Sequence, residues 1–509
     1  ITHDGVFTVA SETGVWDCPP ERIKYLGRLG PGEMIAVDTQ TGKFWKNNAI
    51  DDSLKANHAY REWMTENVIR VWNNDEQERK AANKFMRESA DRLPVFQRMF
   101  GLGAEEIETI IKPMTLNSQE PVGSMGDDTP LAVLSEHNRS IYDYFRQSFA
   151  QVTNPPIDPL RESAVMSLET CIGREHNVFN ETASHAYRVL LPWPVLNYVK
   201  YQTLLKLDQR YYRNVRFSLN FDPDFTGLEA ALENLAESCL QAVREGATII
   251  VLSDRDITTG HLPMPAPLAV GAVHQALLKS GDRANANIII ETGSVRDPHQ
   301  YAVLLGLGAT AIYPYLAFQS INQQQQQGAL EGEPIELRKN YRRGIRKGLL
   351  KILSKMGICT MASYRGSQLF EAVGLAPEVI ELCCPKVTTK INGAGFAELE
   401  ADIERQTSKA WSPPMRPERE GLYRFMYGGE EHAYNPDVVM SLQQAVASGN
   451  WADYRKFADT VDRRKTLSVR DLLKLTPPGE ELPINKVESE DRIFPRFDSA
   501  AMSVGALSP

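Results

Sequence analysis

The stretch ATIIVL, residues 247–252, is a short run of β-branched and other apolar residues, and NIIIE follows at 287–291. An amphipathic helical pattern lies between the two runs, near 266–280. Buried strands joined through a helix run parallel, because the crossover returns the chain to the same end of the sheet. The sequence therefore predicts a βαβ unit here.

The same alternation continues on both sides of this unit. It predicts further strands at 216–221, 310–313 and 358–361. It predicts further helices at 227–245, 298–306 and 340–356. We therefore expect an α/β protein whose central part is a βα repeat, either barrel-like or doubly wound.

Other segments depart from this repeat. Residues 1–50 alternate apolar and polar positions between glycine turns, which indicates a β-rich segment. Residues 51–119 carry apolar side chains at three- and four-residue spacing, typical of short helices. The glutamine run at 323–327 interrupts the repeat, and we predict a surface loop there.

Length and composition limit the function classes. A chain of 509 residues exceeds a single core, so we expect two or three domains. A net charge of −9 argues against nucleic-acid binding, and no apolar run approaches the roughly 20 residues of a membrane span. The six cysteines lack CxxC spacing, which favours reduced thiols in a cytoplasmic protein. Because the chain begins with Ile1 rather than Met, we expect a fragment or a processed product.

Motifs that identify enzyme classes locally are absent from the sequence, including phosphate-binding loops, zinc-ligand spacings and the nucleophile elbow. Six residues lie at or just after the ends of predicted strands, at the end of a parallel sheet where ligands usually bind. They are Asp254, Arg255, Glu291, Thr292, Pro314 and Tyr315. From position alone, a ligand site and a loop-fixing role both remain open.

Several long stretches resemble one known family, in the same order along the chain. They are GSMGDDTP at 123–130, IYDYFR at 141–146, QVTNPPIDPLRE at 151–162, PAPLAVGA at 265–272, GATAIYPYL at 308–316 and SYRGSQLFEAVG at 363–374. These stretches look like the central domain of glutamate synthases. ASETG at 10–14 resembles the end of the family's amidotransferase domain, and the last residues, from Phe497, resemble the first strand of its flavin-binding barrel.

The resemblance implies a domain organisation. It comprises the C-terminal part of a class II glutamine amidotransferase domain at 1–60, a helical connector at 61–150, the central domain at 151–400, a linker region at 401–490, and the start of the FMN-binding synthase domain at 491–509.

The resemblance also implies a role. The intact family enzyme makes two L-glutamate from L-glutamine and 2-oxoglutarate with reducing equivalents, and this segment would be the scaffold and ammonia tunnel between the glutaminase and FMN sites. The isolated segment is predicted to be inactive and to bind no cofactor. The alternative is a stand-alone scaffolding or regulatory protein, without catalysis, derived from the central domain.

For the intact enzyme, the resemblance implies FMN and an iron–sulfur cluster, with FAD and NADPH brought by a small (beta) subunit. The matched stretches look closer to the bacterial NADPH type. The expected partners are the rest of the large chain and that small subunit, and we expect neither nucleic acid nor a membrane as a partner.

Thr153, Asn154 and Pro155 are the candidates for the tunnel wall. Neutral polar side chains can hydrogen-bond ammonia without protonating it, and proline stiffens the segment by restricting φ.

Other singled-out residues receive structural roles. Asp158 and Arg161 are predicted to form an ion pair that fixes the proline-rich turn, on the assumption that Arg161 is buried. Because the resemblance implies no cofactor in this domain, we assign interdomain or loop-fixing roles to Asp254, Arg255, Tyr364 and Arg365.

Overall fold

The computed structural model describes residues 1–72, 76–78, 80–81, 92–121, 126–148, 157–413, 417–476 and 479–497. By its contacts the chain divides into two compact units. The first contains residues 1–68 and 177–187, and the second contains 69–176 and 188–509.

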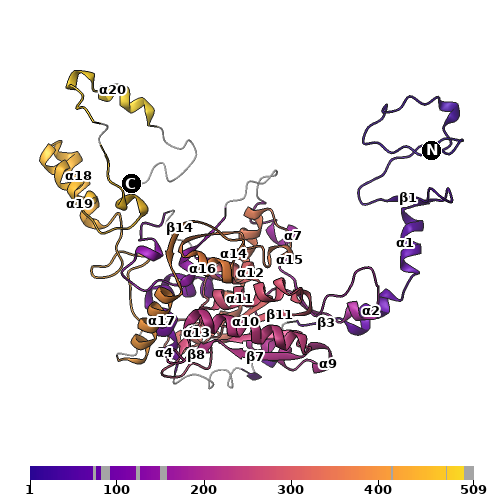
Figure 1. Cartoon of the computed structure of the whole chain (residues 1–509), viewed down its shortest axis with the longest axis horizontal. Coiled ribbons are helices and arrows are strands. Elements are labelled where there is room, and N and C mark those ends of the chain that lie inside the picture. Colours follow the sequence, from indigo (N-terminus) through magenta and orange to yellow (C-terminus); the bar gives the residue numbers. More distant parts are fainter. Residues whose placement is uncertain are drawn as a thin grey trace. The chain divides into compact units, whose positions relative to one another are not determined.

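The first unit contains a short hairpin followed by two helices (Figure 1). Strands β1 (Ile35–Val37) and β2 (Phe44–Lys46) pair antiparallel. Helices α1 (Asn47–Lys55) and α2 (Tyr60–Asn67) come next along the chain. The Tyr60 hydroxyl donates a hydrogen bond to Glu181, which ties the 177–187 segment to α2.

The centre of the second unit is a four-stranded parallel sheet in the order β12-β11-β9-β7. Its strands are β7 (Asn214–Ser218), β9 (Ile249–Ser253), β11 (Asn287–Glu291) and β12 (Ala311–Tyr313). The crossovers contain α10 (Leu228–Arg244), α11 (Ala266–Lys279) and α12 (Pro298–Leu307). The predicted βα repeat is therefore confirmed.

The strand order decides between the two predicted arrangements. A doubly wound sheet reverses its order at a switch point, whereas these four strands follow chain order without reversal. Right-handed crossovers then place successive helices on one face. Helix α11 packs against both α10 and α12, as this requires (Figure 1). The arrangement is the barrel-like one.

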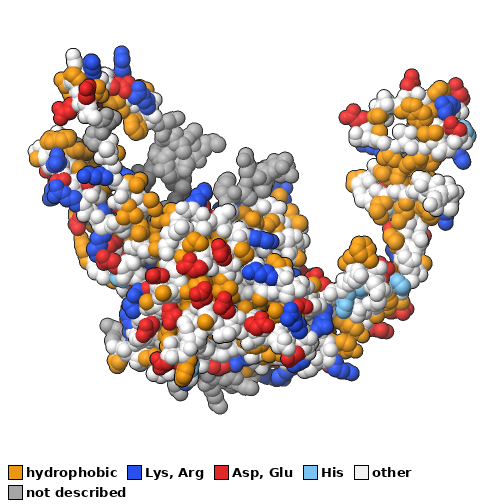
Figure 2. Space-filling view, in the orientation of Figure 1, with side chains coloured by type: hydrophobic (Ala, Val, Ile, Leu, Met, Phe, Trp, Pro, Cys, Tyr) orange, Lys and Arg blue, Asp and Glu red, His pale blue; other side chains and the backbone are white. Residues whose placement is uncertain are grey.

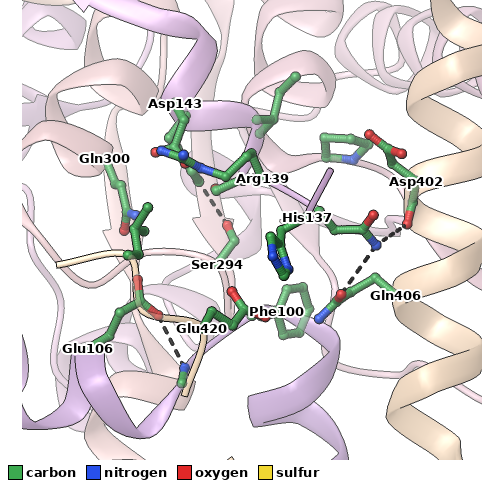
Figure 3. Close-up of a pocket in the computed structure, with 18 of the residues that line it drawn as sticks. Phe100, Glu106, His137, Arg139, Asp143, Ser294, Gln300, Asp402, Gln406 and Glu420 are labelled. Atoms are coloured by element: carbon green, nitrogen blue, oxygen red, sulfur yellow. Dashed lines mark hydrogen bonds and ion pairs between the residues drawn. The ribbon is translucent and has the colours of Figure 1, made fainter. Parts of the chain in front are cut away.

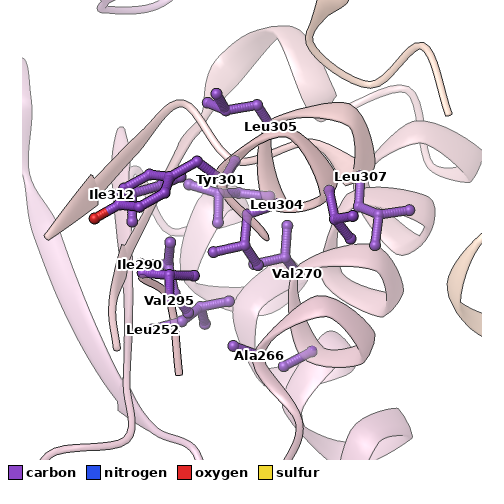
Figure 4. Close-up of a cluster of buried hydrophobic side chains, with 14 of the residues drawn as sticks. Leu252, Ala266, Val270, Ile290, Val295, Tyr301, Leu304, Leu305, Leu307 and Ile312 are labelled. Atoms are coloured by element: carbon purple, nitrogen blue, oxygen red, sulfur yellow. The ribbon is translucent and has the colours of Figure 1, made fainter. Parts of the chain in front are cut away.

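The core lies between this sheet and its crossover helices. Figure 4 shows Leu252, Ile290 and Ile312 from three strands facing Val270 of α11 and Leu304 of α12. Each of these five residues is fully buried. Ile290 is opposite both Leu252 and Ile312 in the ladder, so the three side chains form one row on the same face. Truncating such a side chain to alanine typically costs about 2 to 5 kcal/mol.

The opposite face of the sheet is polar at its carboxyl end. Helix α8 (Tyr198–Leu205) covers this face, and the Tyr201 ring stacks on the Tyr313 ring with centroids 4.6 Å apart. Glu291 of β11 is in the same row as Tyr313 and is 2% exposed. A buried carboxylate on this face needs donors around it.

Shorter strands complete the second unit. One mixed sheet consists of β14 (Thr388–Ala394), β13 (Phe370–Leu375) and β4 (Phe145–Gln147). A second mixed sheet consists of β3 (Ile69–Arg70), β6 (Val189–Leu191) and β5 (Thr170–Ile172). The pair β8 (Asn220–Phe221) and β10 (Leu262–Pro263) is antiparallel.

The described part of the second unit contains further α-helices. They are α4 (Leu93–Met99), α5 (Ala104–Glu106), α6 (Lys112–Asn117), α7 (Glu162–Val165), α9 (Gln209–Tyr212), α13 (Tyr315–Gln326), α14 (Pro334–Met356), α15 (Met361–Tyr364), α16 (Pro377–Cys383), α17 (Phe396–Trp411), α18 (Pro436–Ser448), α19 (Trp451–Asp462) and α20 (Glu490–Ile493).

Two predictions about single elements are wrong. The strand expected at 358–361 is absent, because Thr360 caps α15 by accepting a hydrogen bond from the Ser363 amide. The loop expected at 323–327 is instead the last turn and cap of α13. The buried residues 315–322 start that helix, and glutamine, a good helix former, continues it to its end.

The surface in Figure 2 carries Lys, Arg, Asp and Glu side chains interspersed, without a broad basic patch on the face shown. Among the described residues, no helix has the length and apolar character needed to cross a membrane.

Candidate functional site

A cavity of about 190 Å³ lies in the second unit, beside the carboxyl end of β11. Ser294, Arg296 and Asp297, which follow β11, form one wall. Residues 137–144, helix α17 and the segment 418–423 contribute other walls (Figure 3). The lining combines apolar side chains with many carboxyl groups.

An ion pair between Glu106 and Arg296 is part of this lining. The Arg296 Nε atom donates to Glu106 Oε1 at 2.8 Å, and the side chains are 4% and 11% exposed. Arg296 also donates to the Phe100 carbonyl at 2.9 Å and the Gly101 carbonyl at 3.0 Å. Burial raises the pKa of Glu106 from its ordinary value of 4.5 to about 7, although Arg296 opposes this. Glu106 can therefore exchange a proton near neutral pH.

Arg139 holds a second group of charges at the cavity. Its Nε atom lies 2.9 Å from an Asp143 carboxylate oxygen, and its Nη1 atom lies 3.4 Å from Glu430. Glu430 also accepts from the Ser135 hydroxyl at 2.7 Å. These contacts tie the 135–143 segment to the loop that contains Glu430.

A chain of hydrogen bonds leads from the cavity wall to a buried carboxyl group. The Tyr142 and Ser294 hydroxyls are 2.9 Å apart, and Ser294 is 2.8 Å from the Thr292 hydroxyl. Thr292 donates to Asp254 at 2.5 Å, and the Gly293 amide donates to the same carboxylate at 3.0 Å. Burial raises the pKa of Asp254 from 3.8 to about 7, despite these donors.

Glu291 forms a separate network on the polar face of the sheet. It accepts from the Tyr201 hydroxyl at 2.9 Å and the Ser253 hydroxyl at 2.8 Å. Arg255 and Arg216 approach it at 3.1 and 3.2 Å. Two guanidinium groups and two hydroxyls compensate the buried carboxylate, so this network can fix the strand ends in place.

Of the residues expected at strand ends, the structure pairs Asp254 with Thr292 and Arg255 with Glu291, in two separate networks. Tyr364 and Arg365 lie elsewhere. Tyr364 is 1% exposed on α15, and Arg365 is half-buried, with its pKa lowered by burial. None of these residues lines the cavity, although Ser294, whose hydroxyl is 2.8 Å from that of Thr292, does. Their structural or interdomain role stays a prediction.

The turn containing Asp158 and Arg161 requires a correction. The predicted ion pair forms, but the side chains are 42% and 72% exposed. The assumption that Arg161 is buried is wrong, because the pair closes a surface turn whose contacts are local in sequence. Thr153, Asn154 and Pro155 lie outside the described residues.

The cysteines that the structure describes are all free thiols. Cys383 and Cys384 are fully buried, and burial raises the pKa of both. In the described part of the chain, no three His, Cys, Asp or Glu side chains are grouped as metal ligands. These thiols do not fit an iron–sulfur cluster, which needs grouped thiolates.

Sequence reasoning missed the residues that line the cavity. Arg296 could have been found, because it follows a predicted strand just before a helix start at Asp297 and Pro298. Glu106, His137 and Glu420 come from loops and helix ends far apart in the sequence, with no local motif to mark them.

Comparison with protein-family models assigns the chain to a family. The glutamate synthase central domain matches residues 96–376, more than half of the sequence. The chain belongs to the glutamate synthase family. The class-II glutamine amidotransferases match residues 1–63, and the conserved region in glutamate synthase matches residues 432–509. The finer domain boundaries at 60, 150, 400 and 490 stay predictions.

Curated glutamate synthases are similar along the whole chain. The large chain of the NADPH enzyme of Azospirillum brasilense is 36% identical, and ferredoxin-dependent glutamate synthase 2 of Synechocystis sp. is 38% identical. The NADPH large chain of Bacillus subtilis is 32% identical. Each match covers all of this chain but about a third of the relative, 33% to 34%. The similar identities do not separate the two reductant types.

Among solved structures, a flavocytochrome b2 variant with pyruvate bound is similar over 31% of this chain and 41% of its own. The identity is 17% and the TM-score is 0.23.

Proposed function

We propose that this chain is the middle part of a glutamate synthase large chain, where it acts as scaffold and ammonia conduit between a glutaminase site and an FMN-containing synthase site. The whole enzyme would make two L-glutamate from L-glutamine and 2-oxoglutarate. FMN and an iron–sulfur cluster would be held by other parts of that enzyme.

The order of the family regions carries this proposal. An amidotransferase match at 1–63 precedes the central-domain match at 96–376, and a synthase-region match at 432–509 follows. A segment between a site that releases ammonia and a site that consumes it must span the distance between them. The buried, satisfied network around Glu291 favours a rigid spacer.

The tunnel wall is proposed at Thr153, Asn154 and Pro155, outside the described residues. The described chain resumes at Ile157, whose amide donates to the Ser354 hydroxyl at 3.1 Å, and Ser354 in turn donates to the Ile157 carbonyl at 3.3 Å. This double contact fixes Ile157, the first described residue after the proposed segment, to α14.

The experiment follows nitrogen through the full-length enzyme. Glutamine labelled with heavy nitrogen in its amide is supplied together with excess unlabelled ammonium, and the label in newly formed glutamate is measured by mass spectrometry. Passage through a tunnel keeps the label in glutamate. Dilution of the label to the level of the free ammonium would refute an internal conduit.

A variant tests the proposed wall. Thr153→Val removes one polar contact and keeps the side-chain shape, so glutaminase activity should persist while transfer of label falls. Thr388→Val, on an exposed position of β14, is the matched control and should change neither quantity. Equal loss of both activities in Thr153→Val would indicate misfolding and remove support for the wall.

A stand-alone scaffold derived from the central domain is the alternative. It predicts that no glutaminase or synthase activity accompanies the native protein. The native protein's mass and its activities distinguish the two proposals. For the NADPH type, we expect co-purification with a small subunit that carries FAD, whereas transfer of electrons from ferredoxin alone would contradict that type.

A further inference from the structure

The cavity lining is strongly acidic. It contains eight carboxyl groups and two guanidinium groups. Both guanidinium groups already have partners, Arg139 with Asp143 and Glu430, and Arg296 with Glu106. The cavity therefore has no free guanidinium group to bind an anion, whereas several carboxylates line it.

Glu420 is the carboxylate best placed to receive a cation. Among the described residues, no hydrogen bond or ion pair reaches its side chain. Lys409, whose charge lowers the pKa of Glu420, is itself paired with Glu418 at 2.5 Å. Burial raises the pKa of Glu420, and the ring of His137 is close enough to oppose this (Figure 3). A bound cation would offset the cost of ionising this half-buried group.

Gln300 adds a hydrogen-bond donor to the cavity. The residue is 4% exposed, and its Oε1 atom accepts from the Arg296 amide at 2.8 Å. Because a backbone amide can only donate, this contact fixes which end of the side chain is oxygen. No described residue accepts from the remaining amide nitrogen, which belongs to a side chain that lines the cavity (Figure 3). An acceptor atom of a ligand in the cavity can pair with this nitrogen.

The remaining lining is suited to an alkyl chain. Phe100, Ile141, Met264, Leu399 and Ile403 contribute apolar surface. The volume of about 190 Å³ far exceeds the roughly 10 to 15 Å³ that one water molecule needs by the same measure. A ligand of several non-hydrogen atoms fits this space.

We propose that this cavity binds a small amino alcohol: an alkylammonium group at Glu420, a short apolar chain, and a hydroxyl oxygen that accepts from Gln300. The site would let the central domain sense an amine metabolite without taking part in the chemistry of the enzyme.

Three probes of equal chain length test the proposal on the full-length protein by calorimetry or ligand-observed NMR. They are 4-amino-1-butanol, butylamine without the hydroxyl, and 1,4-butanediol without the charge. We expect the amino alcohol to bind most tightly, with the diol at least about ten-fold weaker, which corresponds to about 1.4 kcal/mol. Equal affinity for all three probes, or no binding of any, would refute the site.

Two variants assign the contacts. Glu420→Gln should weaken the binding of both amines about ten-fold and leave the binding of the diol unchanged. The substitution should not disturb folding, because the Glu420 carboxylate has no hydrogen-bond or ion-pair partner among the described residues. Gln300→Met should weaken the amino alcohol but not butylamine. Glu229→Gln, on the exposed face of α10, is the matched control and should alter no affinity. If Glu420→Gln binds the amino alcohol as tightly as the native protein does, the proposal fails.

Discussion

The Nε atom of Arg296 lies 2.8 Å from the Oε1 atom of Glu106, so a residue beyond the end of β11 is ion-paired with the last residue of α5. These residues are 190 positions apart in the sequence. The pair joins the helical region that precedes the βα repeat to the sheet itself, and it does so at the wall of the cavity.

Removing the cation of this pair should destabilise the second unit. Arg296→Ala leaves Glu106 buried without its partner, which typically costs roughly 3 to 5 kcal/mol. Because Glu106 can then take up a proton, the loss should be smaller at about pH 5 than at about pH 8. Urea unfolding at both pH values measures this difference.

Arg161→Ala is the control for that experiment. Its ion pair with Asp158 is exposed, and exposed pairs contribute little to stability. We expect an unfolding midpoint close to that of the native protein. A loss as large as that of Arg296→Ala would show that burial is not what separates the two pairs.

The stability of the second unit should fall as pH rises through neutrality. Burial raises the folded-state pKa of Asp254 from 3.8 to about 7. The folded state therefore binds more protons than the unfolded state between these values, so this group's stabilising contribution is complete below pH 3.8 and is lost as pH approaches and passes about 7. Asp254→Asn should reduce the difference in unfolding free energy between about pH 5 and pH 8. An unchanged difference would contradict the raised pKa.

The hydroxyl of Thr292 should contribute to stability through Asp254. Thr292→Val keeps the side-chain shape but removes the donor at 2.5 Å, leaving a buried acceptor with fewer partners. We expect a loss of about 1 to 3 kcal/mol in thermal or urea unfolding. Thr388→Val, an exposed position on β14, should stay close to native, and a similar loss in both variants would assign the effect to threonine in general.

The cysteines should differ in reactivity in the native protein. Burial raises the pKa of Cys384 to about 12 and also raises the pKa values of Cys239 and Cys383, so these thiols should resist alkylation. Cys359 is exposed and should react first. Mass spectrometry after brief iodoacetamide treatment measures this, with a denatured sample as the control. Rapid native labelling of Cys383 would contradict its burial.

Local patterns predicted the repeat well, and for a physical reason. The runs at 247–252 and 287–291 are apolar throughout because parallel strands are buried on both faces, so their sequence carries the signal without help from distant residues. The helix starting at Pro298 was likewise marked by its cap, since Asp297 accepts from the Gln300 amide. The strand predicted at 358–361 does not form, because Thr360 is the N-cap of α15 and its side chain accepts from the Ser363 amide.

The sequence by itself determined the family, the βα rhythm and the residues that end the strands, because each depends on neighbours along the chain. Tertiary structure alone decided that Arg161 is exposed while Arg296 is buried, since burial depends on what packs against a side chain from elsewhere. It also decided the cavity, where Glu106, His137, Gln300 and Glu420 meet from distant segments. Desolvation in this packed environment raises the pKa values of Glu106 and Glu420, and no local sequence pattern encodes it.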